Sequence, residues 1–172
     1  MILEINAFHE VNGRKLMDIY GESNRENTSY FYPEIADTNE ALAKVEYDYL
    51  HYIETDFLAD HQNRYIILEH DGIWVCGLRL CQVDDSLYYI EALETHPEHR
   101  NKGYAAELLS GVIDRLKQQG RYTIRDCVGK KNMVSLQVHQ KVGFVIYSNT
   151  GYDYLHNEID PGSYGLQFTF DG

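Results

Sequence analysis

The apolar residues of this chain change their spacing abruptly near residue 100, and this change limits the fold more than any other feature of the sequence. Two runs rich in β-branched and aromatic residues lie within residues 64–85 and meet at Asp71-Gly72, a dipeptide typical of β-hairpin turns. A third such run occupies residues 86–95. From Gly103 to Gly120 the apolar residues instead recur every three or four positions, as on one face of a helix. The chain is therefore predicted to form three consecutive strands followed by a sharp turn into a helix.

Further strands and helices are expected on both sides of this unit. Pro33 separates the first two expected helices, because proline cannot continue a helix. The expected elements are strands at 2–8, 122–128, 144–148 and 164–170, and helices at 13–25, 38–58 and 132–141. Residues 148–164 are expected to form a loop with some extended structure. This mixture predicts an α/β (α+β) domain built on one mixed sheet.

Composition excludes several classes of protein. With 172 residues and no internal repeat, the chain is predicted to be one domain over residues 1–172. Its formal net charge of −12 argues against non-specific binding to nucleic acid, and no apolar stretch is long enough for a membrane-spanning helix. The N-terminal residues lack the pattern of a signal peptide. The three cysteines form neither a metal-binding cluster nor an even-numbered disulfide framework, so we expect a cytoplasmic protein without a metal site.

The turn between residues 95 and 103 has the chemistry of an anion-binding site. A helix N-terminus presents unpaired N–H groups and the positive end of the helix dipole. Gly103 lets the backbone approach an anion closely, and Arg100 and Lys102 add positive charge. The simpler alternative is a basic surface turn without a ligand. The segment matches neither the Walker phosphate loop nor the three-glycine dinucleotide fingerprint.

Two motifs narrow the nature of the anion. Residues 100–105, Arg-Asn-Lys-Gly-Tyr-Ala, fit the pattern Arg/Gln-x-x-Gly-x-Gly/Ala, and residues 132–144 form an Asn-led helical segment that ends in Gly-Phe. In this order, the motifs resemble those of the GNAT superfamily of N-acetyltransferases. The resemblance implies a single-domain fold with a mixed, mostly antiparallel sheet of about seven strands flanked by about four helices. It also implies acetyl-coenzyme A as the co-substrate.

The resemblance also assigns residues to the cofactor. It implies that the backbone of residues 93–95 pairs with the pantetheine arm and that the N–H groups of residues 102–105 hold the pyrophosphate. On the later helix it implies that Asn132 and Ser135 lie near the cofactor, although Asn132 is equally suited to cap that helix. The implied cofactor-binding residues are Leu93, Glu94, Thr95, Arg100, Asn101, Lys102, Gly103, Tyr104, Ala105, Asn132 and Ser135.

Three residues are candidates for catalysis. His139 stands where members of the superfamily often carry a tyrosine that protonates the departing thiolate, and histidine can be a general acid or can merely fill the tyrosine's volume. Glu91 and Glu94 are candidates for the base that removes the amine proton, or are ordinary ion-paired carboxylates. Strand alternation places them on opposite faces unless a bulge intervenes, and Glu91 lies deeper in the strand. Other hydroxyl groups that could act as the acid are those of Tyr104, Tyr147, Tyr152 and Tyr154.

The resemblance implies direct transfer of an acetyl group to a primary amine within a ternary complex. Residues 29–40, 44–57 and 152–163 combine tyrosines with carboxylates, which suits a cationic acceptor, either a small molecule or a protein amine. The rival hypothesis is a non-catalytic module that binds acyl-coenzyme A as a sensor or scaffold. The sequence leaves open a longer acyl group and a homodimer.

Overall fold

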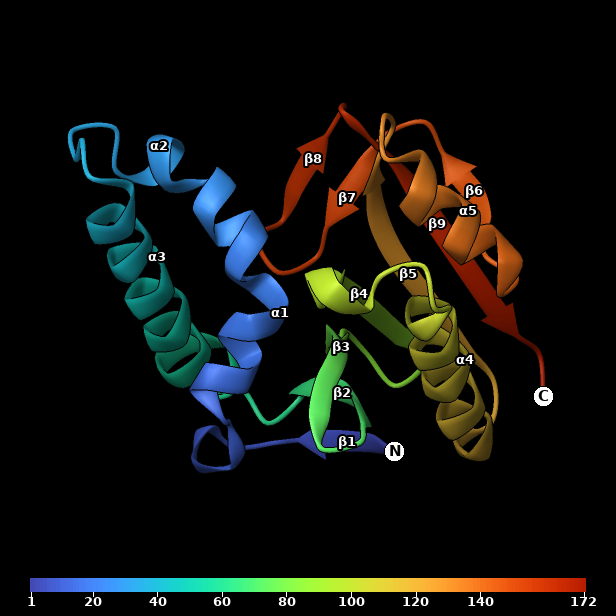
Figure 1. Ribbon diagram of the computed structural model, residues 1–172. Helices are drawn as coiled ribbons and strands as arrows, with labels where there is room; N and C mark the ends of the chain where they lie inside the picture. Colours follow the sequence, from blue (N-terminus) through green and yellow to red (C-terminus); the bar gives the residue numbers. More distant parts are fainter.

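Figure 1 shows the computed structural model, which describes residues 1–172. A central sheet carries helices on both of its faces. The strands are β1 (Ile2–Ile5), β2 (Asn63–His70), β3 (Ile73–Gln82), β4 (Leu87–Thr95), β5 (Tyr122–Gly129), β6 (Val145–Ser148), β7 (Gly151–Asp153), β8 (Glu158–Asp160) and β9 (Ser163–Phe170). The helices are α1 (Gly13–Glu26), α2 (Thr28–Phe31), α3 (Thr38–Tyr52), α4 (Tyr104–Leu116) and α5 (Met133–Lys141). The predicted fold class, a mixed sheet with flanking helices, is confirmed.

The sheet has seven strands in the order β1-β2-β3-β4-β5-β9-β6, and strands β7 and β8 form a separate two-stranded hairpin. Neighbouring strands of the sheet are antiparallel except β4 and β5, which run parallel. The sequence predicted these elements with some differences. The strand expected at 2–8 ends at Ile5, and the expected loop at 148–164 contains the strands β7 and β8. Residues 38–58 divide into α3 and a π-helical turn at Ile53–Phe57. Residues 28–31 form the short helix α2, and Pro33 prevents the helix from continuing.

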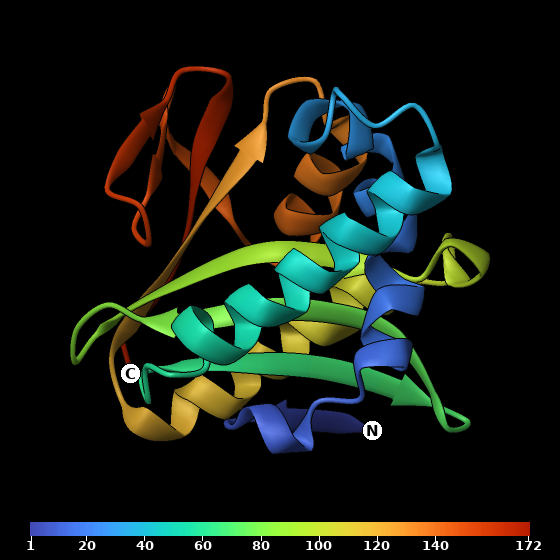
Figure 2. The ribbon, with the colours of Figure 1, turned by 90° about the vertical axis from the view of Figure 1, so that its left-hand side faces the viewer.

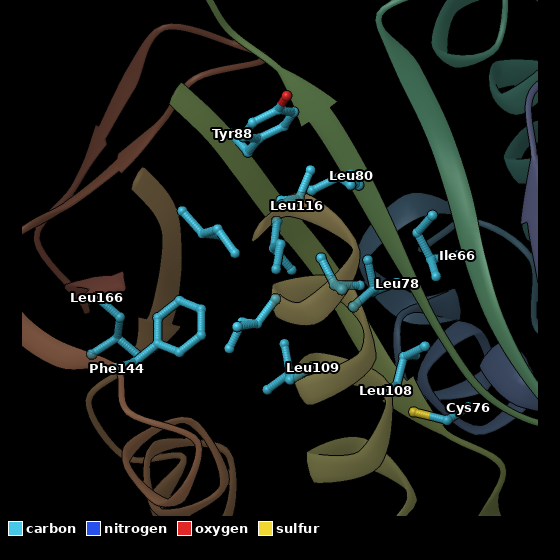
Figure 3. Close-up of a cluster of buried hydrophobic side chains, with 14 of the residues drawn as sticks. Ile66, Cys76, Leu78, Leu80, Tyr88, Leu108, Leu109, Leu116, Phe144 and Leu166 are labelled. Atoms are coloured by element: carbon cyan, nitrogen blue, oxygen red, sulfur yellow. The ribbon is translucent and has the colours of Figure 1, made fainter. Parts of the chain in front are cut away.

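Helices α4 and α5 cover one face of the sheet, and α1 and α3 cover the other (Figures 1 and 2). Helix α4 buries its apolar stripe, including Leu108, Leu109 and Leu116, against Leu78 and Leu80 of β3 (Figure 3). These α4 leucines are at most 3% exposed, and each such burial contributes roughly 1.5–3 kcal/mol. The helical spacing predicted from residue 103 onward therefore corresponds to the face of α4 that holds this side of the core.

Strand β4 contains a bulge at the point where it stops pairing with β5. The register between β3 and β4 shifts between Gly77 and Arg79, and Ala92 has a positive φ of 51°. Pairing with β5 ends one residue before Glu91, at Ile90 opposite Asp126. The Tyr20 hydroxyl of α1 donates a hydrogen bond of 2.7 Å to the Ala92 carbonyl, so the bulge is held from outside the strand. The last residues of β4 therefore have a free edge on the side of β5.

The bulge also decides where the two candidate carboxylates lie. Regular alternation would place Glu91 and Glu94 on opposite faces. The extra residue instead turns both toward the face covered by α1 and α3, where Glu94 accepts a hydrogen bond from Ser23 of α1. Glu91 pairs with Arg79, whose guanidinium lies over Tyr52 near the end of α3. The expectation for a strand without a bulge does not apply here.

A buried pair, Asp126 of β5 and His139 of α5, joins these two elements on the other face of the sheet. Nε2 of His139 lies 2.8 Å from Oδ2 of Asp126, and Nδ1 lies 2.8 Å from the carbonyl oxygen of Ser135. Because a carbonyl only accepts, Nδ1 carries a proton, and the pair shares one further proton between Nε2 and Oδ2. Burial by itself lowers the pKa of His139, but the hydrogen bond to Asp126 and its charge outweigh burial and raise it. The pair is therefore neutral as a whole, which suits its fully buried position.

We predict that His139→Phe lowers the free energy of unfolding by about 3 kcal/mol at pH 7, because it leaves the Asp126 carboxylate buried without a partner. The loss should shrink as the pH falls. Burial raises the pKa of Asp126, so the folded protein binds a proton where the unfolded chain does not, and acid then favours the folded state. Urea unfolding at several pH values measures both effects. The double variant Asp126→Leu/His139→Phe is the control and should recover most of the loss; a pH-independent loss without recovery would contradict the prediction.

Candidate functional site

A pocket of about 640 Å³ opens between the free end of β4, the turn that follows it and α5. A volume of this size is typical of small-molecule sites. All the implied cofactor residues except Lys102 line it: Leu93, Glu94, Thr95, Arg100, Asn101, Gly103, Tyr104, Ala105, Asn132 and Ser135. The structure therefore brings together two motifs that lie about 30 residues apart in the sequence.

The first turn of α4 presents a row of backbone donors without acceptors. The N–H of Glu107 is the first to bond within the helix, to the Gly103 carbonyl at 3.0 Å. The N–H groups of residues 102–106 make no hydrogen bond within the chain, and Gly103 offers no side chain to cap them. Asn101 and Gly103 both have positive φ, of 61° and 84°, which turns successive N–H groups toward a common concavity. This arrangement is suited to bind an anion.

The basic side chains of the turn do not behave as a simple set of anion ligands. Arg100 lines the pocket, but its guanidinium is ion-paired with Glu22 of α1 and lies 3.8 Å from Glu94. The ammonium of Lys102 lies 3.5 Å from Nδ1 of His99, outside the pocket lining. Lys102 thus offers its backbone N–H to the concavity, and Arg100 ties the turn to α1.

Helix α5 forms the wall of the pocket opposite the turn. Oδ1 of Asn132 accepts a hydrogen bond of 3.1 Å from the N–H of Ser135, so Asn132 caps α5 and lines the pocket as well. The implied set also lacks His99 and Ala106, which line the pocket near the turn. On α5 it lacks Val134, Val138 and Lys141. These three recur at intervals of four and three residues, so extending the helical face beyond Asn132 and Ser135 would have identified them.

The three candidate catalytic residues occupy different positions. Glu94 lines the pocket, whereas Glu91 and His139 do not. His139 is completely buried, both of its ring nitrogens have partners within the chain, and its ring packs edge-on against Phe144. This placement favours the packing interpretation of His139 over proton donation into the pocket.

The two carboxylates are partly desolvated and paired. Oε1 of Glu91 lies 2.8 Å from Nε of Arg79, and burial raises the pKa of Glu91 although Arg79 opposes the shift. Burial also raises the pKa of Glu94, against the hydrogen bond of 2.9 Å from Ser23 and the charge of Arg100. Both groups therefore hold a proton more readily than a glutamate in water, and Glu91 lies nearer the end of the β4–β5 pairing.

Tyr49, one of the tyrosines in the segment 44–57 expected on the acceptor side, packs against the core. Its hydroxyl bonds to that of Tyr65, and Tyr65 and the neighbouring Tyr20 are buried. Burial raises the pKa of all three phenols, so they are neutral hydroxyl groups at physiological pH. Burial likewise raises the pKa of the Cys76 thiol to about 12, which leaves it without nucleophilic thiolate.

The described residues include no group of three or more metal-type side chains, and none of the helices combines the length and apolar character needed to cross a membrane.

The chain matches 51 residues of the L-amino acid N-acyltransferase MnaT of Escherichia coli (strain K12) at 37% identity, a stretch that covers 30% of each protein.

Solved structures share the fold over nearly the whole chain. One is the PaiA N-acetyltransferase of Thermoplasma acidophilum in complex with coenzyme A (TM-score 0.65, 15% identity, 99% of both chains). Another is the Campylobacter jejuni N-acetyltransferase PseH in complex with acetyl coenzyme A (TM-score 0.57, 18% identity, 98% of both chains). The sequence model of the acetyltransferase (GNAT) family matches residues 16–144. The chain therefore belongs to the acetyltransferase (GNAT) family.

Proposed function

We propose that the protein transfers the acetyl group of acetyl-coenzyme A directly to a primary amine in a ternary complex. The observation that carries the proposal is the run of unbonded N–H groups at residues 102–106, at one end of a pocket whose other walls are the free edge of β4 and helix α5. Family membership supports the transfer of an acetyl group, and the match to MnaT supports an amine acceptor.

The residues of the pocket fit coenzyme A in two respects. The unbonded N–H groups of residues 102–106 and the dipole of α4 would hold the pyrophosphate. The backbone of Leu93–Thr95, which has no β5 partner, would bond to the amide groups of the pantetheine arm as an added strand does. When bound, the thioester supplies the activated acetyl group.

Glu91 is our choice for the base. An ammonium must lose a proton before its nitrogen can form an amide bond, and the burial that raises the pKa of Glu91 makes this carboxylate a better acceptor for that proton. Glu91 directly follows the last β4–β5 pair, so it can take the proton either directly or through one water. Glu94 is the second choice, since Ser23 and Arg100 already occupy both of its oxygens.

We assign no general acid. As the amide bond forms, the carbon–sulfur bond breaks and its electron pair remains on sulfur. A thiol with a pKa of ~8.5 can leave as the thiolate and take a proton from water afterwards. His139 is needed for α5 packing in this scheme and not for proton transfer, consistent with its two internal hydrogen bonds.

We also propose a cytoplasmic location, because the free cysteines suit a reducing compartment.

The first test is turnover. We expect the protein to release coenzyme A from acetyl-coenzyme A in the presence of primary amines and to bind acetyl-coenzyme A in a calorimeter. The position of His139, which pairs with Asp126 and does not line the pocket, favours one alternative, a non-catalytic acyl-coenzyme A-binding module. Binding without thiol release across amines, amino acids and peptides would establish that alternative.

We predict that Gly103→Glu weakens acetyl-coenzyme A binding by at least about tenfold, because it brings negative charge to the phosphate site and a side chain to a backbone with positive φ. Gly103→Ala should have a smaller effect, through strain alone. Gly120→Ala is the matched control: Gly120 also has a positive φ and open space around its Cα, but it lies beyond the far end of α4. Equal affinities for all three variants would refute the placement of the phosphates.

We predict that Glu91→Gln lowers kcat about 100-fold at pH 7 while the Kd for acetyl-coenzyme A stays unchanged. The deficit should become smaller as the pH rises, because the amine then loses its proton without help. Steady-state kinetics from pH 6 to 10 measure both effects, and Glu94→Gln provides the comparison. A deficit independent of pH, or a larger one in Glu94→Gln, would exclude Glu91 as the base.

A further inference from the structure

Arg125 of β5 is a half-buried cation without a counter-charge. The two other half-buried arginines each have a carboxylate: Arg64 lies 3.1 Å from Glu4, and Arg79 lies 2.8 Å from Glu91. Arg125 has no carboxylate within 4.0 Å, although the chain carries 27 of them. Withdrawing an unpaired charge from water is unfavourable, so this position requires another explanation.

Two aromatic rings lie against the Arg125 guanidinium. The centre of its guanidinium lies 4.6 Å from the Tyr147 ring of β6 and 5.8 Å from the Tyr154 ring, which belongs to the turn between β7 and β8. The Tyr147 ring can lie there because residue 165 is glycine; a Cβ at that position would come within 2.8 Å of the ring. Cation–π contacts of this kind position an arginine without neutralising it.

One edge of the guanidinium is left free. Nη1 bonds to the Tyr154 hydroxyl, whereas Nε and Nη2 have no hydrogen-bond partner in the chain. Nε is buried, and Nη2 retains contact with solvent. Nε and Nη2 form the side edge of the guanidinium, the fork that matches the two oxygens of a carboxylate. An anion can bond first to the solvent-exposed Nη2. It can then also bond to Nε if the partly exposed Tyr147 ring moves aside.

Arg125 lies on the acceptor side of the proposed reaction centre. Alternation along β5 places it on the face opposite Asp126, the same face as Glu91. Its register partner on β4 is Tyr89, two residues before Glu91, which puts the Cα atoms of Arg125 and Glu91 about 8 Å apart. The β7–β8 hairpin lies beside β5 (Figure 1). The Tyr154 ring in its turn lies 5.4 Å from that of Tyr89.

We propose that the acceptor carries a carboxylate as well as its amine, and that Arg125 binds this carboxylate while Glu91 faces the amine. This inference rests on the proposed function and narrows its substrate to amino acids. It also replaces the expectation of a purely cationic amine, since Arg79 already pairs with Glu91.

The test compares amino acids with their amides. Alanine, methionine, phenylalanine, β-alanine and 4-aminobutyrate, each beside its carboxamide, are titrated calorimetrically into the protein loaded with coenzyme A. We expect at least one acid to bind at least ten times more tightly than its amide. Arg125→Gln should remove this preference, weakening the acid at least tenfold and leaving the amide unchanged. Arg125→Lys keeps the charge but lacks the two-pronged guanidinium edge. Its preference for the acid should lie between those of the original protein and Arg125→Gln.

Arg121→Gln is the matched control, because Arg121 is exposed, directly precedes the same strand and has no ion pair within the chain. Equal binding of acids and amides, binding of no acid, or equal losses in Arg121→Gln and Arg125→Gln would each overturn the inference. Acetyl transfer is measured separately with the same compounds. Acid binding that depends on Arg125 without any transfer would refute the proposed function alone. Equal transfer to acids and amides by both the original protein and Arg125→Gln would refute this inference alone.

Discussion

Strands β4 and β5 run parallel only as far as Ile90 and Asp126, and the rest of the candidate site depends on this early end of their pairing. A parallel pair that continued would have used the backbone groups of Leu93–Thr95 in the sheet. The bulge at Ala92 prevents this by adding a residue to β4, and the hydrogen bond from Tyr20 fixes its carbonyl from the other side. A positive φ at a residue with a Cβ is unfavourable, so the surrounding structure must hold it.

The same interruption connects two faces that the sheet would otherwise separate. The pocket lies where β4, α4 and α5 meet, whereas Glu91 and Arg125 face the side of α1 and α3. A thioester held at the free edge of β4 would be reachable from both sides. A co-substrate and an acceptor can then be bound at the same time with their reacting atoms close together, as direct transfer requires.

Much of this architecture could be predicted from the sequence, because it depends on local patterns. The hairpin at Asp71-Gly72, the change of period at Gly103 and the donors of residues 102–105 all follow from short segments. The bulge could not be predicted, since alanine carries no signal for a positive φ. The partners of His139 and Arg100 come from other elements, Asp126 of β5 and Glu22 of α1, and their identity required the tertiary structure.

These partners change how the polar residues of the site are ranked. By residue type, His139 and Arg100 were the strongest candidates for catalysis and anion binding, yet both already satisfy their hydrogen bonds or charge within the chain. The groups without partners are less conspicuous in the sequence: backbone N–H groups, one strand edge and the guanidinium edge of Arg125. Buried polar groups in folded proteins are nearly always paired. Nε of Arg64 and Nε of Arg79 also lack a hydrogen bond, but each of these arginines has a carboxylate beside it, whereas Arg125 has neither. By this criterion the acidic composition of the chain gives little information about the acceptor, whereas Arg125, which has no carboxylate partner, indicates an acceptor that carries a negative charge.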